Sequence, residues 1–233
     1  MKLVVKNIKK KYDEKEVLKG LNFKFEEGKI YALLGRNGAG KTTFFNCLNN
    51  DIEYDEGEYY FEDDKGNRIN INDSDFGYVL SSPVVPDFLT AREFIRFFIE
   101  INEGKIKEKK DENYYFDLVH IDEEDRDKLL KDFSHGMKNK MQMLVNIVSN
   151  SKILLLDEPL TSLDVVVAEE MKELLKSIKH NRILIFSTHI MELAMTLCDE
   201  IVLLNHGVFE SIDKKKLSNE ELKNTIIKSL KEE

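Results

Sequence analysis

One eight-residue stretch limits what this chain can fold into more than any other feature. It reads Gly35-Arg36-Asn37-Gly38-Ala39-Gly40-Lys41-Thr42, and Thr43 follows it. Two glycines with four residues between them, then a lysine and a hydroxyl residue, make the G-x-x-x-x-G-K-[ST] pattern of a phosphate-binding loop. Apolar segments stand on either side, at Ile30–Leu34 and Thr43–Leu48. This order predicts a strand, a loop and a helix, the context that the pattern requires.

The residue types in this loop suit the phosphates of a nucleotide. Glycine lets the backbone approach a phosphate in conformations that other residues avoid. Successive N–H groups at a helix N-terminus attract the anion. We expect Lys41 to place its charge on the β- and γ-phosphates and the Thr42 hydroxyl to bind Mg²⁺. All residues from Gly35 to Thr43 are therefore candidates for nucleotide binding, unless the match is a glycine-rich turn that arose by chance.

A pair of acids ends a second apolar segment. Ile153–Leu156 is followed by Asp157 and Glu158, about 115 residues after the phosphate loop. Side chains alternate along a strand, so the two carboxylates cannot do the same job. We expect Asp157 to bind Mg²⁺, directly or through water, and Glu158 to polarise an attacking water, which is typically worth about 10²–10⁴-fold in rate. The alternative is a strand that simply ends in solvated acids.

Hydrophobic patterning divides the chain into strand-rich ends and a helical middle. Thr90 and Glu93 form a capping box, which predicts a helix that ends near Asn102, before Gly104. Further helices are expected at 113–120, 123–132, 165–177 and 190–197, and the charged tail 213–233 is expected to be helical. Strands are expected at 3–8, 21–25, 30–34, 57–61, 69–71, 76–80, 153–156 and 183–186, with a hairpin over 201–212.

Strands that alternate with helices predict right-handed crossovers in a parallel sheet. We therefore expect an α/β fold of the P-loop NTPase type. Its core would be a mixed, mainly parallel sheet, with antiparallel strands near the N-terminus and an inserted helical subdomain at about 87–150. Residues 1–233 would form a single nucleotide-binding domain.

Four further motifs resemble those of one family. The run Phe133-Ser134-His135-Gly136-Met137-Lys138-Asn139-Lys140 stands about 20 residues before the acid pair. Thr161-Ser162-Leu163-Asp164 follows the pair, Ser187-Thr188-His189 ends a strand, and Tyr12 precedes the phosphate loop. Together, in this order, they resemble the signature, D-loop, switch histidine and adenine-stacking aromatic of the ABC (ATP-binding cassette) ATPases. The closest resemblance is to the ATPase subunits of bacterial ABC-2-type, multidrug or bacteriocin exporters.

This resemblance implies a mechanism. Two subunits would pack head to tail, as a homodimer or with a related ATPase, and hold ATP and Mg²⁺ between them. Ser134 and the N–H of Gly136, at the start of a helix from Met137, would contact the γ-phosphate across the interface. His189 would hold the γ-phosphate and the attacking water, Asp164 would connect the two sites, and Tyr12 would stack on adenine. Glu158, His189 and Lys41 would be the catalytic residues.

One position departs from the family pattern. The family usually has a glutamine after the strand that corresponds to Gly77-Tyr78-Val79, in a loop that touches Mg²⁺ and the helical subdomain. Here Leu80 is followed by Ser81 and Ser82. Ser81 is the expected metal contact, or Ser82 if the loop is shifted. Because serine is shorter than glutamine, the contact would run through water or be lost.

Composition narrows the choice of partners. The chain is 42% hydrophobic and 34% charged, with a net charge of −9, which is typical of a globular domain and unfavourable for binding nucleic acid. Cys47 and Cys198 lie among apolar residues and are expected to be buried hydrophobes. No apolar run approaches the roughly 18 residues that cross a bilayer. We expect a cytoplasmic protein, held at the inner face of the cell membrane by a multi-span permease.

Three functions remain open from the sequence. The first is the ATPase subunit of a membrane ABC transporter, expected to be an exporter. The second is a soluble ABC ATPase with a non-membrane partner, although the chain has one cassette and no sustained heptads. The third is a small-molecule kinase with the same phosphate loop, which leaves Ser134–Lys140, Asp164 and His189 unexplained.

Overall fold

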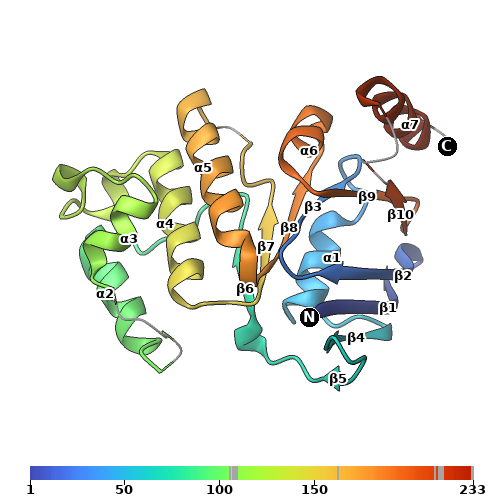
Figure 1. Ribbon diagram of the computed structural model, residues 1–233, viewed down its shortest axis with the longest axis horizontal. Helices are drawn as coiled ribbons and strands as arrows, with labels where there is room; N and C mark the ends of the chain where they lie inside the picture. Colours follow the sequence, from blue (N-terminus) through green and yellow to red (C-terminus); the bar gives the residue numbers. More distant parts are fainter. Residues whose placement is uncertain (105, 107–109, 162, 213, 215–217, 232–233) are drawn as a thin grey trace.

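The central sheet has six strands in the order β10-β9-β3-β8-β7-β6 (Figure 1). The computed structural model describes residues 1–104, 106, 110–161, 163–212, 214 and 218–231. Four neighbouring pairs in this sheet are parallel, and only the β9–β10 hairpin is antiparallel. The strands are β3 (Ile30–Leu34), β6 (Phe76–Val79), β7 (Ile153–Asp157), β8 (Ile183–Thr188), β9 (Glu200–Asn205) and β10 (Val208–Ile212). The predicted mixed, mainly parallel sheet is confirmed.

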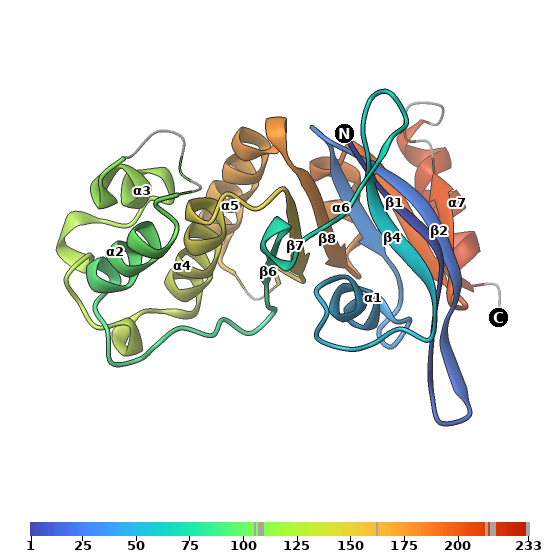
Figure 2. The same ribbon diagram turned by 90° about the horizontal axis from the view of Figure 1, so that it is seen from below.

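A second sheet is antiparallel and comes mostly from the N-terminus. Its order is β2-β1-β4-β5, and it lies beside the central sheet with helix α1 nearby (Figure 2). Its strands are β1 (Lys2–Tyr12), β2 (Lys15–Glu26), β4 (Glu56–Glu62) and β5 (Arg68–Ile69). β1 and β2 are longer than the sequence patterns predicted, because bulges in their pairing let both strands continue past the breaks in hydrophobic alternation.

Seven helices occur in the described residues. They are α1 (Lys41–Leu48), α2 (Ala91–Ile101), α3 (Glu112–Leu118), α4 (His135–Val148), α5 (Val165–Ile178), α6 (Met191–Leu197) and α7 (Asn219–Lys231). Thr90 caps α2 and Asn102 ends it, as predicted. The helix predicted over 123–132 is wrong: that segment holds only the 3₁₀ turns η2 (Glu123–Asp125) and η3 (Leu130–Asp132). Two similar turns occur elsewhere, η1 (Asp73–Asp75) and η4 (Lys179–Asn181).

Alternation along the central strands divides the core into two layers. In β3, Ala32 and Leu34 face a cluster that includes buried residues of α2, α4, α5 and α6. Tyr31 and Leu33 face the opposite cluster, where α1 packs with β1, β2 and β4. Because every residue of β3 is buried, the strand that leads into the phosphate loop is fixed on both faces.

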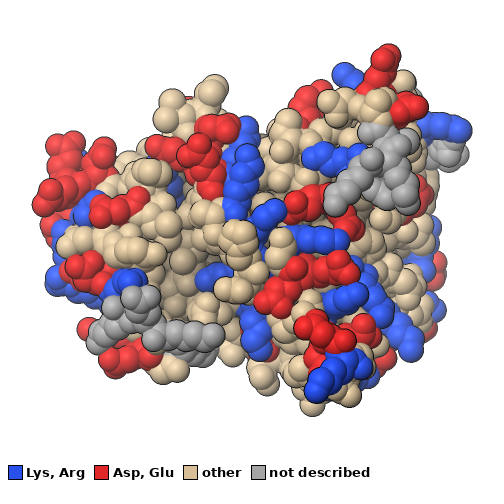
Figure 3. All heavy atoms as spheres, viewed as in Figure 1, with Lys and Arg blue, Asp and Glu red and all other residues tan. Residues whose placement is uncertain are grey.

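The surface carries charges of both signs. On the face shown in Figure 3, acidic and basic side chains are interspersed over most of the molecule, and acidic groups gather at the end formed by the helical segment. Within the described residues, no helix combines the length and the apolar character needed to cross a membrane.

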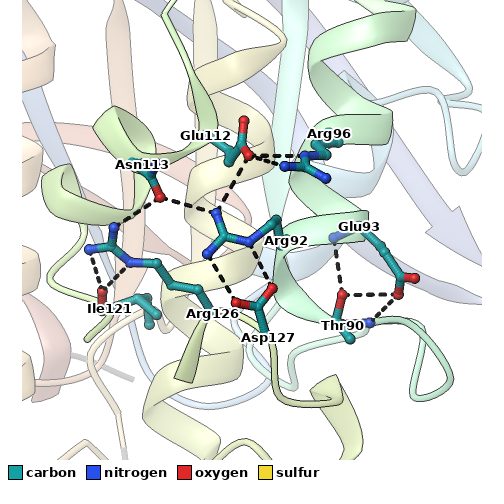
Figure 4. Close-up of polar contacts among 9 residues, drawn as sticks. All are labelled: Thr90, Arg92, Glu93, Arg96, Glu112, Asn113, Ile121, Arg126 and Asp127. Atoms are coloured by element: carbon teal, nitrogen blue, oxygen red, sulfur yellow. Dashed lines mark hydrogen bonds and ion pairs between the residues drawn. The ribbon is translucent and has the colours of Figure 1, made fainter. Parts of the chain in front are cut away.

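A polar network organises the helical segment between β6 and β7. Arg92 of α2 donates to Asp127, Asn113 and Glu112, and Arg96 also donates to Glu112 (Figure 4). Arg126 is 8% exposed and donates from Nε and Nη2 to the Ile121 carbonyl, at 3.1 and 3.0 Å. The network joins α2 and α3 to the segment that leads into α4. The helix expected over 123–132 does not form. Instead, hydrogen bonds such as those from Arg126 to the Ile121 carbonyl hold the segment in a loop conformation.

Candidate phosphate-binding site

The phosphate loop follows β3 and enters α1. Gly40 stands at the N-cap of α1 with φ at +105°, and a Cβ there would lie 2.9 Å from Cγ1 of Val17. Both facts exclude a side chain at this position. The Gly40 carbonyl accepts from the Phe44 N–H at 2.9 Å, which begins the helix. The first N–H groups of α1 are thereby left to face an anion.

Lys41 lies at the base of this loop and is 7% exposed. Its Nζ donates to the Gly35 carbonyl at 2.9 Å and to the Arg36 carbonyl at 3.3 Å, and it lies 3.7 Å from Oε1 of Glu158. Burial lowers the pKa of Lys41, and the charges of Glu158 and Asp157 oppose that shift. The carbonyls of the loop thus hold the ammonium group at its base.

Thr42 and Asp157 face each other although 115 residues separate them. The Thr42 Oγ1 donates to Oδ2 of Asp157 at 2.8 Å, and Ser187 donates to Oδ1 of the same carboxylate. A hydroxyl and a carboxylate are the oxygen ligands that Mg²⁺ accepts beside substrate phosphates. Within the described residues no cluster of three His, Cys, Asp or Glu side chains could hold a metal. The Thr42 hydroxyl and the Asp157 carboxylate suit a Mg²⁺ ion, whose remaining ligands would come from nucleotide phosphates and water.

Glu158 is held by a strained backbone and by side chains from two loops. Its φ is +50°, a left-handed conformation that costs a non-glycine residue about 1–3 kcal/mol. Its N–H donates to the Ser187 hydroxyl at 3.0 Å, which offsets part of that strain. Its carboxylate accepts from the Thr161 hydroxyl at 3.0 Å and lies 3.0 Å from Nδ1 of His189. The two groups expected to act on the attacking water thus contact each other directly.

A pocket of about 320 Å³ brings most of the predicted residues together. It is lined by Val17, Asn37, Gly38, Gly40, Lys41, Thr42, Thr43, Ser81, Asp157 and Glu158. Of the two serines considered for the metal contact, only Ser81 lines this pocket. Arg36 and Ala39 line the neighbouring pocket, together with the β9–β10 turn. Tyr12 lies outside both pockets: it is 46% exposed at the end of β1, with the Lys10 ammonium 5.4 Å from its ring centre.

Three predicted residues lie on a different surface of the same chain. Ser134 caps α4, whose first residue is His135 and not Met137, and its Oγ accepts from the Met137 N–H at 3.2 Å. Asp164 caps α5 in the same way. A Cβ at Gly136 would lie 3.3 Å from Cγ1 of Val167, so the two capped helix starts adjoin. None of the three lines the phosphate pocket of its own chain.

Sequence reasoning gave no role to three residues that the structure places in the site. Ser187 joins Asp157 to the Glu158 backbone, Thr161 orients the Glu158 carboxylate, and Val17 forms a wall of the pocket. Ser187 and Thr161 belong to motifs that were recognised, so their hydroxyl groups next to catalytic positions were an available signal. Val17 had no local signal, because only the tertiary fold brings β2 to the loop.

A phosphate loop and an acid pair at the carboxyl ends of the parallel strands β3 and β7, which flank β8, define a P-loop nucleotide-binding domain. The ABC transporter family profile matches residues 18–161, which is more than half of the chain. The chain belongs to this family, as its ATP-binding ATPase domain.

Similar proteins agree with this assignment. An uncharacterised ABC transporter ATP-binding protein of Methanocaldococcus jannaschii is 32% identical over 208 residues, which cover 88% of this chain and 75% of that protein. A spermidine/putrescine import ATP-binding protein of Mycoplasma capricolum is 30% identical over 213 residues, or 90% of this chain, but the chain spans only 60% of that relative's length.

Solved structures show the same fold. A nucleotide-free ATP-binding cassette from an ABC transporter superposes with a TM-score of 0.79 at 19% identity, covering 99% of this chain and 98% of that one. A dimeric cassette in a post-hydrolysis state, bound to ADP and Pi, gives 0.74 at 21% identity, covering 91% and 98%.

Proposed function

We propose that this chain is the ATPase subunit that powers a membrane ABC transporter. We further propose that it works as one half of a dimer that binds ATP between its two subunits. One observation supports the proposal: the residues expected to hold ATP fall into two groups, and only one group lines the phosphate pocket. The phosphate pocket holds Lys41 and Glu158, whereas Ser134 and Gly136 lie elsewhere on the molecule. A second copy, or a related ATPase, would bring the second surface to the first pocket.

The residues of the site divide the chemistry as follows. Lys41 and the N–H groups of the loop hold the phosphates, and Thr42 with Asp157 holds Mg²⁺, which would neutralise phosphate charge. Glu158 accepts a proton from the attacking water, and His189 holds the γ-phosphate and that water. Ser81, which lines the same pocket, would contact the metal. Tyr12 would stack on adenine.

The other subunit would complete the site. A helix N-terminus aimed at the γ-phosphate offers N–H donors and a favourable dipole. Ser134 and Gly136 would supply these donors from α4, and Asp164 would connect the two sites. Hydrolysis removes the γ-phosphate that both subunits share, so the pair loosens. In this way a chemical step becomes a shift between closed and open states.

A membrane partner fits the surface near Ser81. Val84 and Phe88, in the loop that leads from β6 to α2, are 69% and 79% exposed. Large apolar groups in a loop beside the metal contact suit a helix-rich permease at the inner face of the membrane. Export is part of the proposal because the signature resembles that of exporter ATPases. Several of the matched relatives are named as import proteins, so the direction of transport needs its own test.

The decisive experiment uses Glu158→Gln, which should bind ATP without turning it over. We would trap this variant with ATP and Mg²⁺ in its native cells, solubilise the membranes gently, and identify what co-purifies. A stoichiometric multi-span membrane protein supports the transporter proposal, and inside-out vesicles that contain the complex then give the direction. A trapped dimer found only in the soluble fraction, with soluble partners, would contradict the transporter proposal and favour a soluble ABC ATPase.

A further inference from the structure

Arg182 is a buried cation whose contacts are made with one helix end. It precedes β8 and is 9% exposed. Its Nη1 donates to the Asn146 carbonyl at 3.3 Å, and its Nη2 donates to the Ile147 carbonyl at 3.2 Å and to Oδ1 of Asn150 at 3.4 Å. All three acceptors belong to the last turn of α4 or to the turn after it. No described carboxylate pairs with the guanidinium, so its charge is directed at the end of α4.

The partial charges at the end of α4 favour the Arg182 guanidinium at this position. The carboxyl end of a helix carries partial negative charge on its last carbonyls, which a nearby cation stabilises. Burial lowers the pKa of Arg182, but a guanidinium remains charged in proteins. Asn150 adopts a left-handed conformation with φ at +54° and directs its side-chain oxygen to the same group. The end of α4 is thereby fixed to the start of β8.

The packing around this helix end is incomplete. A hollow of about 590 Å³ lies beside Arg182, with Tyr114 and Leu118 of α3, Ile147 of α4 and Ile178 of α5 among its lining residues. It lies at the seam between the helical segment and the sheet. Val148 of the last turn is buried, and Asn146 donates to the Tyr78 carbonyl, so the core and β6 hold the other side of this helix end. On the side of the hollow, the hydrogen bonds from Arg182 join the end of α4 to the start of β8.

Helix α4 converts a small rotation at this end into a large displacement at the other. Its 14 residues rise about 1.5 Å each, so the axis is about 21 Å long. A tilt of about 10° at the Arg182 end would move the Ser134 end by about 4 Å, which is longer than a hydrogen bond. The same tilt leaves Lys41 and Thr42 in place, because they are attached to β3 and α1.

We propose that Arg182 is a positioning residue that sets the angle of α4 against the catalytic sheet, and so controls nucleotide-driven pairing of two chains without affecting ATP binding to one chain. The inference rests on the proposed function, since pairing requires Ser134 and Gly136 to reach the γ-phosphate on the other subunit. It assigns a role in the reaction to a residue that lies at the opposite end of β8 from His189.

The test uses the full chain with Glu158→Gln, to which we add Arg182→Met or Arg182→Lys. Lys179→Gln is the matched control, because Lys179 lies three residues away and pairs with Asp199 instead of α4. For each variant we would measure the urea unfolding midpoint, the affinity for a fluorescent ATP analogue under conditions that keep the chain monomeric, and the dimer dissociation constant with ATP by analytical ultracentrifugation.

We expect Arg182→Met to fold with a lower urea midpoint, because methionine keeps the apolar length of the side chain but leaves the Asn146 and Ile147 carbonyls without these donors. Its ATP affinity should stay within about twofold of the parent, while its dimer dissociation constant rises at least tenfold. The dimer dissociation constant of Arg182→Lys should fall between those of the parent and Arg182→Met, since one ammonium cannot reach all three acceptors. Lys179→Gln should match the parent in all three measurements.

Dimerisation of Arg182→Met equal to that of Lys179→Gln would overturn the inference. Equal losses of ATP affinity and dimerisation would overturn it as well, because they would indicate a general packing role. If Arg182→Met does not fold, Arg182→Lys decides by the same criteria. Failure of the parent Glu158→Gln protein to pair with ATP would instead contradict the proposed function, so the two failures are distinguishable.

Discussion

At the scale of single residues, the site is held by hydroxyl groups that carry no charge. Ser187 uses its one hydroxyl hydrogen on Asp157 and accepts from the N–H of Glu158, so it fixes a metal ligand and a strained backbone together. Thr161 then restrains the Glu158 carboxylate. Hydroxyl groups suit this task because they orient a carboxylate without neutralising its charge.

Ser81 and Glu158 should differ in their importance for turnover. Glu158 contacts His189 and lies close to Lys41, whereas Ser81 is a short, exposed wall residue. We expect Glu158→Gln to lower kcat about 10²–10⁴-fold, and Ser81→Ala to lower it by less than about tenfold. Steady-state phosphate release with both purified variants measures the difference. Equal losses of turnover would contradict the division of roles.

Glu26 provides a prediction about pH. Hydrogen bonds from Lys29 and then Lys2 lower the pKa of Glu26 from its usual 4.5 to about 2. A depressed carboxylate pKa stabilises the fold above about pH 4.5, and that contribution is lost as the pH falls toward 2. Wild type should therefore unfold at higher urea than Glu26→Gln at pH 7, and the gap should shrink between pH 4.5 and 2.5. A gap that stays constant over this range would be inconsistent with the shift.

At the scale of elements, the helical segment depends on arginines that join its helices to its loops. Arg126 is the most buried of them and satisfies the Ile121 carbonyl with two hydrogen bonds. Through Arg92 and Asp127 the same network holds the start of α2 against the segment that leads to Ser134. The segment after α3 is therefore ordered although it contains only short 3₁₀ turns.

Arg126→Ala should destabilise the chain by about 1–3 kcal/mol, because it leaves a buried carbonyl without a donor. Lys128→Ala is the control: Lys128 pairs with Asp125 on the surface, where such pairs are worth about 0–1 kcal/mol. Urea unfolding curves of the two variants provide the comparison. If both lose the same amount, the buried network is not what orders this segment.

At the scale of the whole molecule, the proposed pairing makes each ATP site depend on a second chain. Glu158→Gln should dimerise in ATP and Mg²⁺, and adding Ser134→Ala should weaken the dimer by about tenfold, the effect of losing one hydrogen bond to a charged group. Ser177→Ala, at the far end of α5, should leave the dimer unchanged. Size-exclusion chromatography with light scattering detects the change. A dimer that forms equally well without ATP would argue against nucleotide-driven pairing.

Short sequence patterns correctly predicted the elements whose formation depends on nearby residues. The fully apolar runs at 153–156 and 183–186 became buried parallel strands, and the capping box at Thr90 marked the start of α2. The segment 123–132 was predicted wrongly because its order comes from Arg126 contacts and not from helical periodicity. Val17 and Arg182 could not be recognised, since each has its role through partners that are distant in sequence.

The order of strands in the central sheet also determines when the site can exist. β3 lies between β8 and β9, which follow it by about 150 residues or more, and the Thr42–Asp157 contact spans 115 residues. Sheets built from such distant pairings form late, because the chain must close long loops first. During synthesis, the phosphate loop therefore leaves the ribosome well before the strands that support it. Because Ser187 of β8 holds Asp157 and the backbone of Glu158, we expect newly made chains to retain nucleotide only after β8 has joined the sheet, late in synthesis.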